Sequence, residues 1–368
     1  MAYIAPKDFS LDSNLLAKLT KVFSGDLDLS WMKQIPERIA VAPSQPGRGL
    51  TLDDINVGSY APERSPEIVR HNFSMAPRGA LLPQGLPSLG YRLNRKSEVW
   101  SDSAAEIFEE GKSRRWAPAQ DVPWAVLDAA DLSDTEDAAW RQIATGLVSI
   151  GLVAGDVAAH WEWQMNQEFH EVKYVMCLQM IDAARISEAF RKRALYGQGR
   201  MGTDYRELGE LLKMVFESGT YPSASASMNL VLFSWVQGIG RHLEWAATNP
   251  ADRQLGTRLT QDASRFVAYG VSHLRYLLGA RPNEAEALNA HLDLVENGVV
   301  GWLAAREWIE PLVVLSDGLD PVASFYRRCH DEVLARCRAA GLGDRRARSP
   351  LVHFLDMLAA DGDTGRPA

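Results

Sequence analysis

The sequence predicts an all-α protein built around a bundle of long helices. Eleven of the 18 prolines lie between Pro6 and Pro123, and none lies between Pro123 and Pro222. Proline removes a backbone donor and clashes inside a helix, so the chain after Trp124 is free to form long helices, whereas residues 1–125 should be mostly extended or irregular. Apolar residues then recur at helical spacing, and no segment shows the alternation of a half-buried strand.

The first hundred residues have the composition of a loop-rich arm. Residues 36–90 are rich in Pro, Gly and Ser and lack a sustained apolar period. Within residues 1–125 only 101–111 has a helical pattern, with acidic residues inside it and basic residues directly after it, which complements the helix dipole. We therefore assign residues 1–100 to an N-terminal arm.

The rest of the chain reads as a series of helices with short links. Ser133 and Glu136 form a capping-box pattern before apolar residues at helical spacing, which predicts a helix over 133–155. Further helices are predicted over 166–195, 204–217, 223–247, 251–278, 283–315, 321–340 and 350–359. Long helices with short links are typical of bundles, so we expect a helical domain over 101–318 and a C-terminal helical extension over 319–368.

Composition narrows the partners and the compartment. With 39 Lys+Arg against 47 Asp+Glu, the net charge is −8 and no basic block could follow a phosphate backbone, so we expect no nucleic-acid partner. No uninterrupted apolar stretch reaches the ~20 residues of a membrane span, and we expect a cytoplasmic protein without a membrane partner.

Cys177, Cys329 and Cys337 form no CxxC pair, which argues against a disulfide framework or a thiolate zinc site. Cys177 is expected to be a small core residue.

Two helices carry nearly the same short string. Asp-Ala-Ala-Arg-Ile occupies 182–186, and Asp-Ala-Ser-Arg-Phe occupies 262–266, 80 residues later. Each string lies on a predicted helix that follows another long helix, which indicates two helix hairpins related by a pseudo-twofold axis. That symmetry predicts that Asp182 pairs with Arg265 and Asp262 with Arg185, bridges within each helix being the simpler alternative.

The two strings resemble the Asp-Glu-x-Arg-His motif that occurs twice in ferritin-like diiron-carboxylate proteins, which include the hydroxylases of bacterial multicomponent monooxygenases. The segments 121–124, 188–195 and 267–274 also resemble a group of bacterial ferritin-like proteins, and the resemblance covers about residues 100–318. It implies a ferritin-like four-helix bundle core. In such proteins each Glu-x-x-His motif and a further Glu on each preceding helix bind the iron pair.

This chain departs from that motif at every expected ligand. The motif positions carry Ala, Ile and Phe, which offer no lone pair to iron, and the two preceding helices lack a carboxylate at the corresponding place. The six positions, interpreted as a vestigial metal site, are Gly151, Ala183, Ile186, Ser234, Ala263 and Phe266. We therefore expect no catalytic residue, no metal and no cofactor here.

The polar residues of both strings remain although the ligands between them are gone. The resemblance implies that Asp182 and Asp262 would lie behind a metal-binding histidine and orient it. Without that histidine, we interpret them with Arg185 and Arg265 as buried Asp–Arg bridges. The alternative is that the four residues anchor a polar ligand in the vacated bundle centre.

A second set of polar residues lies on the helix of the first string. Glu171 shares a helix face with Tyr174 and Asp182, so it could point inward, and with Glu188 these residues could line a polar pocket. A displaced mononuclear metal site on Glu171 and its neighbours is one reading. A solvated or salt-bridged helix face is the other.

Three functions stay open on these observations. The first is a non-catalytic pseudo-enzyme or scaffold that forms a homodimer or a heterodimer with an intact ferritin-like homologue. The second is a metal-independent enzyme or ligand-binding protein that uses the remodelled bundle centre. The third is a diiron oxidase or monooxygenase-like oxidoreductase whose ligands have moved.

Overall fold

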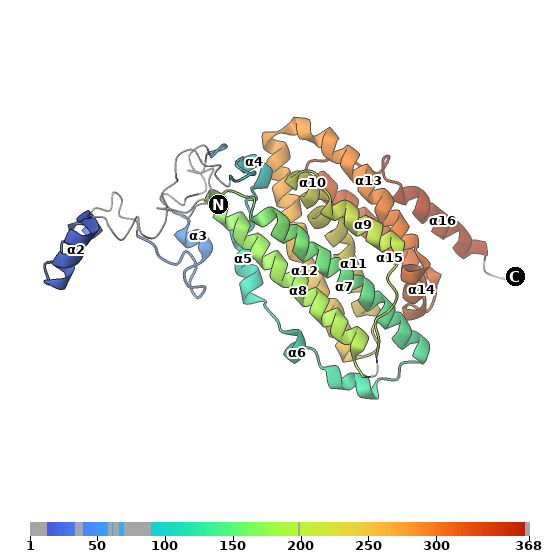
Figure 1. The fold of residues 1–368 in the computed structure, drawn as a ribbon. Helices are drawn as coiled ribbons and strands as arrows, with labels where there is room; N and C mark the ends of the chain where they lie inside the picture. Colours follow the sequence, from blue (N-terminus) through green and yellow to red (C-terminus); the bar gives the residue numbers. More distant parts are fainter. Residues whose placement is uncertain are drawn as a thin grey trace.

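The computed structural model describes residues 13–33, 40–57, 61, 66–69, 90–197 and 199–364. Within these residues there is no β-strand, and the bridges Ile68–Arg95 and Leu93–Met165 are isolated. The core is a four-rod bundle, in which α7 lies along α8 and α11 lies along α12 (Figure 1). The predicted all-α bundle is therefore confirmed. Its rods are α7 (Asp134–Glu162), α8 (His170–Leu195), α12 (Pro250–Ala280), and the succession α10 (Tyr221–Ser225), η6 (Ala226–Leu232) and α11 (Phe233–Ala246).

Helix α7 begins where the capping-box pattern predicts. Ser133 Oγ accepts a hydrogen bond from the backbone N–H of Glu136 at 3.2 Å, and Glu136 Oε2 accepts one from the N–H of Ser133 at 2.8 Å. The helix does not end at Gly155, as expected from the sequence, but continues to Glu162. Its most apolar 18-residue window has a mean hydropathy of 1.5, which would suit a membrane span by composition, yet 61% of that window is buried in the bundle. Burial against other helices accounts for this apolar surface.

The third rod contains a π-helical segment that the sequence pattern did not predict. The segment 223–247 was expected to be a single α-helix, but residues Ala226–Leu232 form a π-helix, and all seven are buried. A π-helix holds an extra residue per turn and is an uncommon insertion in an α-helix. It shifts the register of the rod near its start, directly after α10.

Further helices surround the bundle. The predicted helix over 283–315 is divided in two, because Ala305 has an extended backbone with ψ 131°. Helix α13 packs on α9, α14 on α7, and α15 on α11. The bounds of the outer helices are α9 (Arg206–Phe216), α13 (Ala285–Ala304), α14 (Arg306–Leu315), α15 (Leu319–Ala339), α16 (Leu351–Thr364) and the 3-10 turns η5 (Gln167–Phe169) and η7 (Pro282–Glu284).

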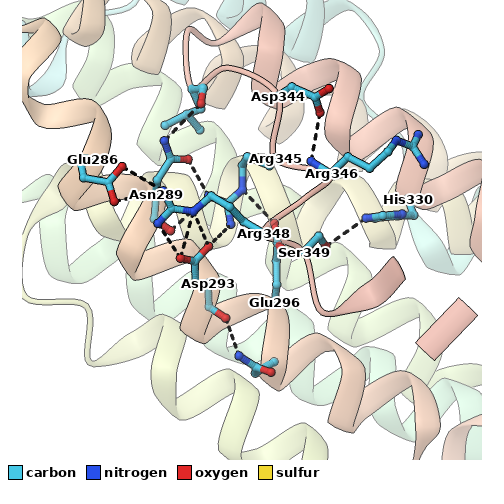
Figure 2. Close-up of polar contacts among 12 residues, drawn as sticks. Glu286, Asn289, Asp293, Glu296, His330, Asp344, Arg345, Arg346, Arg348 and Ser349 are labelled. Atoms are coloured by element: carbon cyan, nitrogen blue, oxygen red, sulfur yellow. Dashed lines mark hydrogen bonds and ion pairs between the residues drawn. The ribbon is translucent and has the colours of Figure 1, made fainter. Parts of the chain in front are cut away.

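A buried arginine attaches the segment after α15 to the outer helix α13 (Figure 2). Arg345 lies in the turn between α15 and α16 and is fully buried. Its guanidinium donates to Glu296 Oε1 at 3.0 Å, to Asn289 Oδ1 at 2.6 Å and to Asp293 Oδ1 at 2.9 Å, all on α13. Arg348 adds an ion pair to Asp293 at 2.7 Å. The end of the chain is thereby held by charge pairs as well as by apolar packing.

The N-terminal region is partly helical. Helix α5 (Ala104–Ser113) confirms the helix predicted over 101–111, whereas α2 (Ser13–Phe23) was not predicted, although Leu15, Leu19 and Val22 recur on one helix face. Most of the arm over 36–90 lies outside the described residues. Cys177 is exposed on α8, so its expected core position is wrong, because it lies on the outer side of that helix. The shorter elements are η1 (Ser30–Lys33), α3 (Leu52–Ile55), α4 (Lys96–Val99), α6 (Pro118–Asp121) and η4 (Trp124–Ala129).

Candidate functional site

The two repeated strings meet inside the bundle. Arg265 Nε lies 2.6 Å from Asp182 Oδ2, and Arg185 Nη2 lies 3.2 Å from Asp262 Oδ1. Each arginine also pairs with the aspartate three residues earlier on its own helix. The predicted bridges across the pseudo-twofold axis and the alternative bridges within each helix are thus both present. We call these four side chains the Asp–Arg tetrad.

The N-terminal region covers the tetrad. Trp116 donates its indole N–H to Asp262 Oδ2 at 3.0 Å, and Arg265 Nη1 lies 3.1 Å from Glu110 Oε2. Burial, with the nearby charge of Asp262, raises the pKa of Asp182 above its ordinary value despite the two arginines. The tetrad therefore joins α8 and α12 to the segment that precedes α7.

The six interpreted ligand positions all lie in the interior. Ala183, Ala263 and Phe266 are fully buried, and Ile186, Ser234 and Gly151 are also buried. The ring of Phe266 stacks on Phe233 with centroids 3.7 Å apart and planes 4° apart. The hydroxyl of Ser234 donates a hydrogen bond to the carbonyl oxygen of Leu230 in its own rod, so its hydrogen is not available to a ligand. Five of these six positions therefore contribute no polar side-chain group to the bundle interior, and the sixth is satisfied within its own rod.

Position 151 has no room for a side chain. A Cβ on Gly151 would collide with the hydroxyl of Ser187 and lie 2.8 Å from the carbonyl oxygen of Ala183. One turn later, a Cβ on Gly155 would meet only the Ala183 Cβ, at 3.8 Å. Glycine at 151 thus lets α7 and α8 approach closely at the level where the family motif places a carboxylate.

A buried chain of hydrogen bonds connects several helices of the bundle, and sequence reasoning missed it. Gln179 Nε2 donates to Asn229 Oδ1 at 3.0 Å, and Asn229 Nδ2 donates to Ser225 Oγ at 3.1 Å. His273 contacts Ser225 Oγ through Nδ1 and the carbonyl oxygen of Glu98 through Nε2, each at 2.9 Å. The carbonyl can only accept, so Nε2 carries the proton and Nδ1 accepts from Ser225.

This chain of bonds joins α8, η6, α10, α12 and α4. Burial lowers the pKa of His273 to about 4, so the ring is neutral at pH 7 and keeps the tautomer that the chain requires. The register shift in η6 accompanies the inward placement of Asn229. The contacts account for these polar residues as cross-links between rods.

The residues proposed for a polar pocket are not brought together. Glu171 is buried and accepts a hydrogen bond from Asn56, whose Oδ1 also lies 3.0 Å from His170 Nε2. Tyr174 is 42% exposed. Glu188 is exposed and pairs with Lys192. Glu188 follows Glu171 by 17 residues on one straight helix, about 25 Å at 1.5 Å per residue, which is too far for a common pocket.

Glu171 and Glu188 therefore belong to different places. Burial and the charge of Asp53 raise the pKa of Glu171 to about 7 where α3 meets α8. Glu188 instead lines an open cavity of about 710 Å³ on the outer side of α7 and α8, with Trp124, Leu152 and Leu195.

The residues at the bundle centre do not fit a dinuclear metal group. Among the residues that the structure describes, no three His, Cys, Asp or Glu side chains are arranged to hold a metal ion. The motif positions offer no lone pair, Phe233 and Phe266 fill the space between the rods, and position 151 cannot take a carboxylate.

Comparison with solved structures shows that the chain has a ferritin-like helical fold. It matches a variant of an R2-like ligand-binding oxidase with an anaerobically reconstituted Mn/Fe cofactor, with a TM-score of 0.51 and 15% identity over 67% of this chain and 95% of the other. Another variant matches with a TM-score of 0.48 and 16% identity over the same shares. No family model and no curated protein sequence matches the chain. The likeness establishes the fold.

Proposed function

We propose that this chain is a non-catalytic member of the ferritin-like fold, a pseudo-enzyme that acts as a scaffold or partner subunit. The observation that carries the proposal is the closed bundle centre. Phe266 stacks on Phe233 where the family motif would place a histidine, and Gly151 packs against α8 where it would place a carboxylate.

The way in which the centre is filled supports loss of a metal site over displacement of its ligands. Burying polar groups without partners is costly, and the replacements at 183, 186, 263 and 266 are apolar and buried. The aspartates and arginines of the repeated strings satisfy each other in the tetrad. The surroundings of the former ligands have thus become a packed core with an internal ion-pair network.

The partner in this proposal is a second copy of the chain or an intact ferritin-like homologue. Large apolar side chains remain exposed on the outer side of the α7–α8 pair, where Leu152 is 59% and Leu195 is 41% exposed. Exposed apolar residues next to an apolar cavity are typical of contact surfaces. Light scattering of the purified chain would measure self-association, and co-purification with such a homologue would measure the mixed pair.

Metal analysis tests the proposal most directly. Protein produced with added iron and with added manganese should bind well below two metal ions per chain, and no oxo-bridged diiron absorption should develop with oxygen. A variant with Glu at 183 and 263 and His at 186 and 266 should also fail to form the full site, because the carboxylates at Gly151 and near Ser234 are still missing. A stoichiometric dinuclear centre in the unmodified chain would overturn the proposal in favour of an oxygen-activating oxidoreductase.

A further inference from the structure

A cavity of about 390 Å³ lies between α11 and α15, outside the bundle centre. It is lined by one face of α11, which includes Gly238 and Trp245, and by one face of α15. Gly240, on the opposite side of α11, contacts α12. The cavity is therefore separated from the Asp–Arg tetrad by the α11 rod.

Glycine determines where the cavity is closed. A Cβ on Gly238 would collide with Cys329 Sγ, so α11 and α15 can approach this closely only at a glycine. Trp245 lies two turns further along α11, and its side chain lines the same cavity. At this contact Gly238 meets the side chains of Cys329 and Phe325.

A stack of three aromatic rings forms one wall. Phe325 and His242 stack with centroids 4.3 Å apart and planes 9° apart, and Trp245 lies on His242 with centroids 5.3 Å apart. His242 is held by Ser316, whose Oγ lies 2.8 Å from Nε2. Trp245 is 63% exposed, so the stack ends in an indole that is fixed on one side and open to solvent.

Two arginines provide positive charge beside this wall. Arg241 is paired with Glu332 at 2.6 Å. Arg328 lines the cavity and has no ion-pair or hydrogen-bond partner in the described part of the chain. Arg328 is exposed, and the planar fork of N–H donors in a guanidinium matches carboxylate and phosphate oxygens.

We propose that this cavity binds a small planar aromatic anion, with its ring against Trp245 and its carboxylate or phosphate on Arg328. The volume is at the lower end of the ~300–1,000 Å³ typical of small-molecule sites, which suits a one- or two-ring ligand. Stacking and a charge-assisted hydrogen bond supply the two contacts such a ligand needs. This proposal does not depend on whether the bundle centre holds a metal site.

Titration calorimetry with matched probes tests the two contacts separately. AMP and 2-naphthoate each combine a planar ring with an anion, as phosphate and carboxylate respectively. Adenosine lacks the anion, and ribose 5-phosphate lacks the ring. At least one of the two aromatic anions should bind about tenfold or more tightly than either incomplete compound, because each contact contributes about a factor of ten.

Substitutions locate the binding. Trp245→Ala and Arg328→Gln should each weaken binding of that probe about tenfold, and both side chains are exposed enough for the variants to fold. Trp163→Ala, at another exposed tryptophan, and Arg327→Gln, at the exposed neighbour on α15, should leave the affinity unchanged. Equal binding of the incomplete probes, unchanged affinity in both site variants, or no binding of either aromatic anion at millimolar concentration would each overturn the proposal.

Discussion

Arg265 Nε lies 2.6 Å from Asp182 Oδ2, so the second repeated string is joined to the first across the bundle axis. Both side chains are almost completely buried. Replacing Asp182 by Ala leaves two buried arginines with one carboxylate fewer between them. We expect the free energy of unfolding to fall by about 3 kcal/mol or more, because an uncompensated buried charge is costly.

Urea denaturation at pH 7.5 measures this change. Glu188→Ala is the matched control on the same helix, since its carboxylate is exposed and its pair with Lys192 should contribute well under ~1 kcal/mol. A change near zero for Asp182→Ala would mean that water reaches the tetrad and would refute its role as a cross-link.

Gly151 and Gly155 provide a paired test of the close approach of α7 and α8. Gly151→Ala should destabilise the protein by about 1–3 kcal/mol, because its Cβ collides with Ser187 and the backbone of Ala183. Gly155→Ala meets only ordinary van der Waals contact and should stabilise by about 0.5–1 kcal/mol through helix propensity. The melting temperatures of the two variants should therefore shift in opposite directions relative to wild type, as measured by thermal denaturation. Equal shifts in melting temperature would show that α7 and α8 leave room for a side chain at position 151.

Glu171 should make stability depend on pH. Its ordinary pKa is 4.5, and burial raises it to about 7 in the folded protein, so the folded state retains a proton that the unfolded state has lost between these values. The contribution of Glu171 to stability therefore falls as the pH rises from about 4.5 to about 7 and is constant above that range.

Glu171→Gln removes this titration while keeping an acceptor for Asn56. The variant should gain stability relative to wild type as the pH rises through that window, by on the order of 1–2 kcal/mol at pH 8. Denaturation curves from pH 4 to 8 measure the difference in the free energy of unfolding between the variant and wild type. The titration of Asp182 is common to both proteins and cancels in this difference. A difference that is independent of pH would place Glu171 in a solvated environment.

Arg345 should be a major attachment of the C-terminal segment. Arg345→Ala leaves Glu296 buried without its partner, and we expect a loss of about 3–5 kcal/mol. Its neighbour Arg346 pairs with Asp331 at the surface, and Arg346→Ala should change stability by no more than about 0.5 kcal/mol. Limited proteolysis of both variants would show whether residues after α15 are released, and equal protection would contradict the attachment.

Local signals in the sequence determined most of the long helices and the inward placement of the two repeated strings on α8 and α12. The absence of proline between Pro123 and Pro222 allowed the long helices α7 and α8, the Ser133–Glu136 capping box set the start of α7, and the repeated strings identified the pairing of Asp182 with Arg265. These features depend on residues three or four positions apart, or on one symmetry relation between two helices. They can therefore be predicted from the sequence without knowledge of the other tertiary contacts.

Only the tertiary structure decided which residues from distant segments of the chain contact one another. The π-helix of η6 and the break at Ala305 follow from packing against other rods, and no residue in either stretch forces them. The partners of Glu171 and Arg345 lie 115 and 49 residues away, at Asn56 and Glu296. The cavity beside Trp245 exists because α11 and α15 touch at Gly238. Such contacts depend on the relative placement of whole helices, which the apolar period of each helix constrains but does not specify.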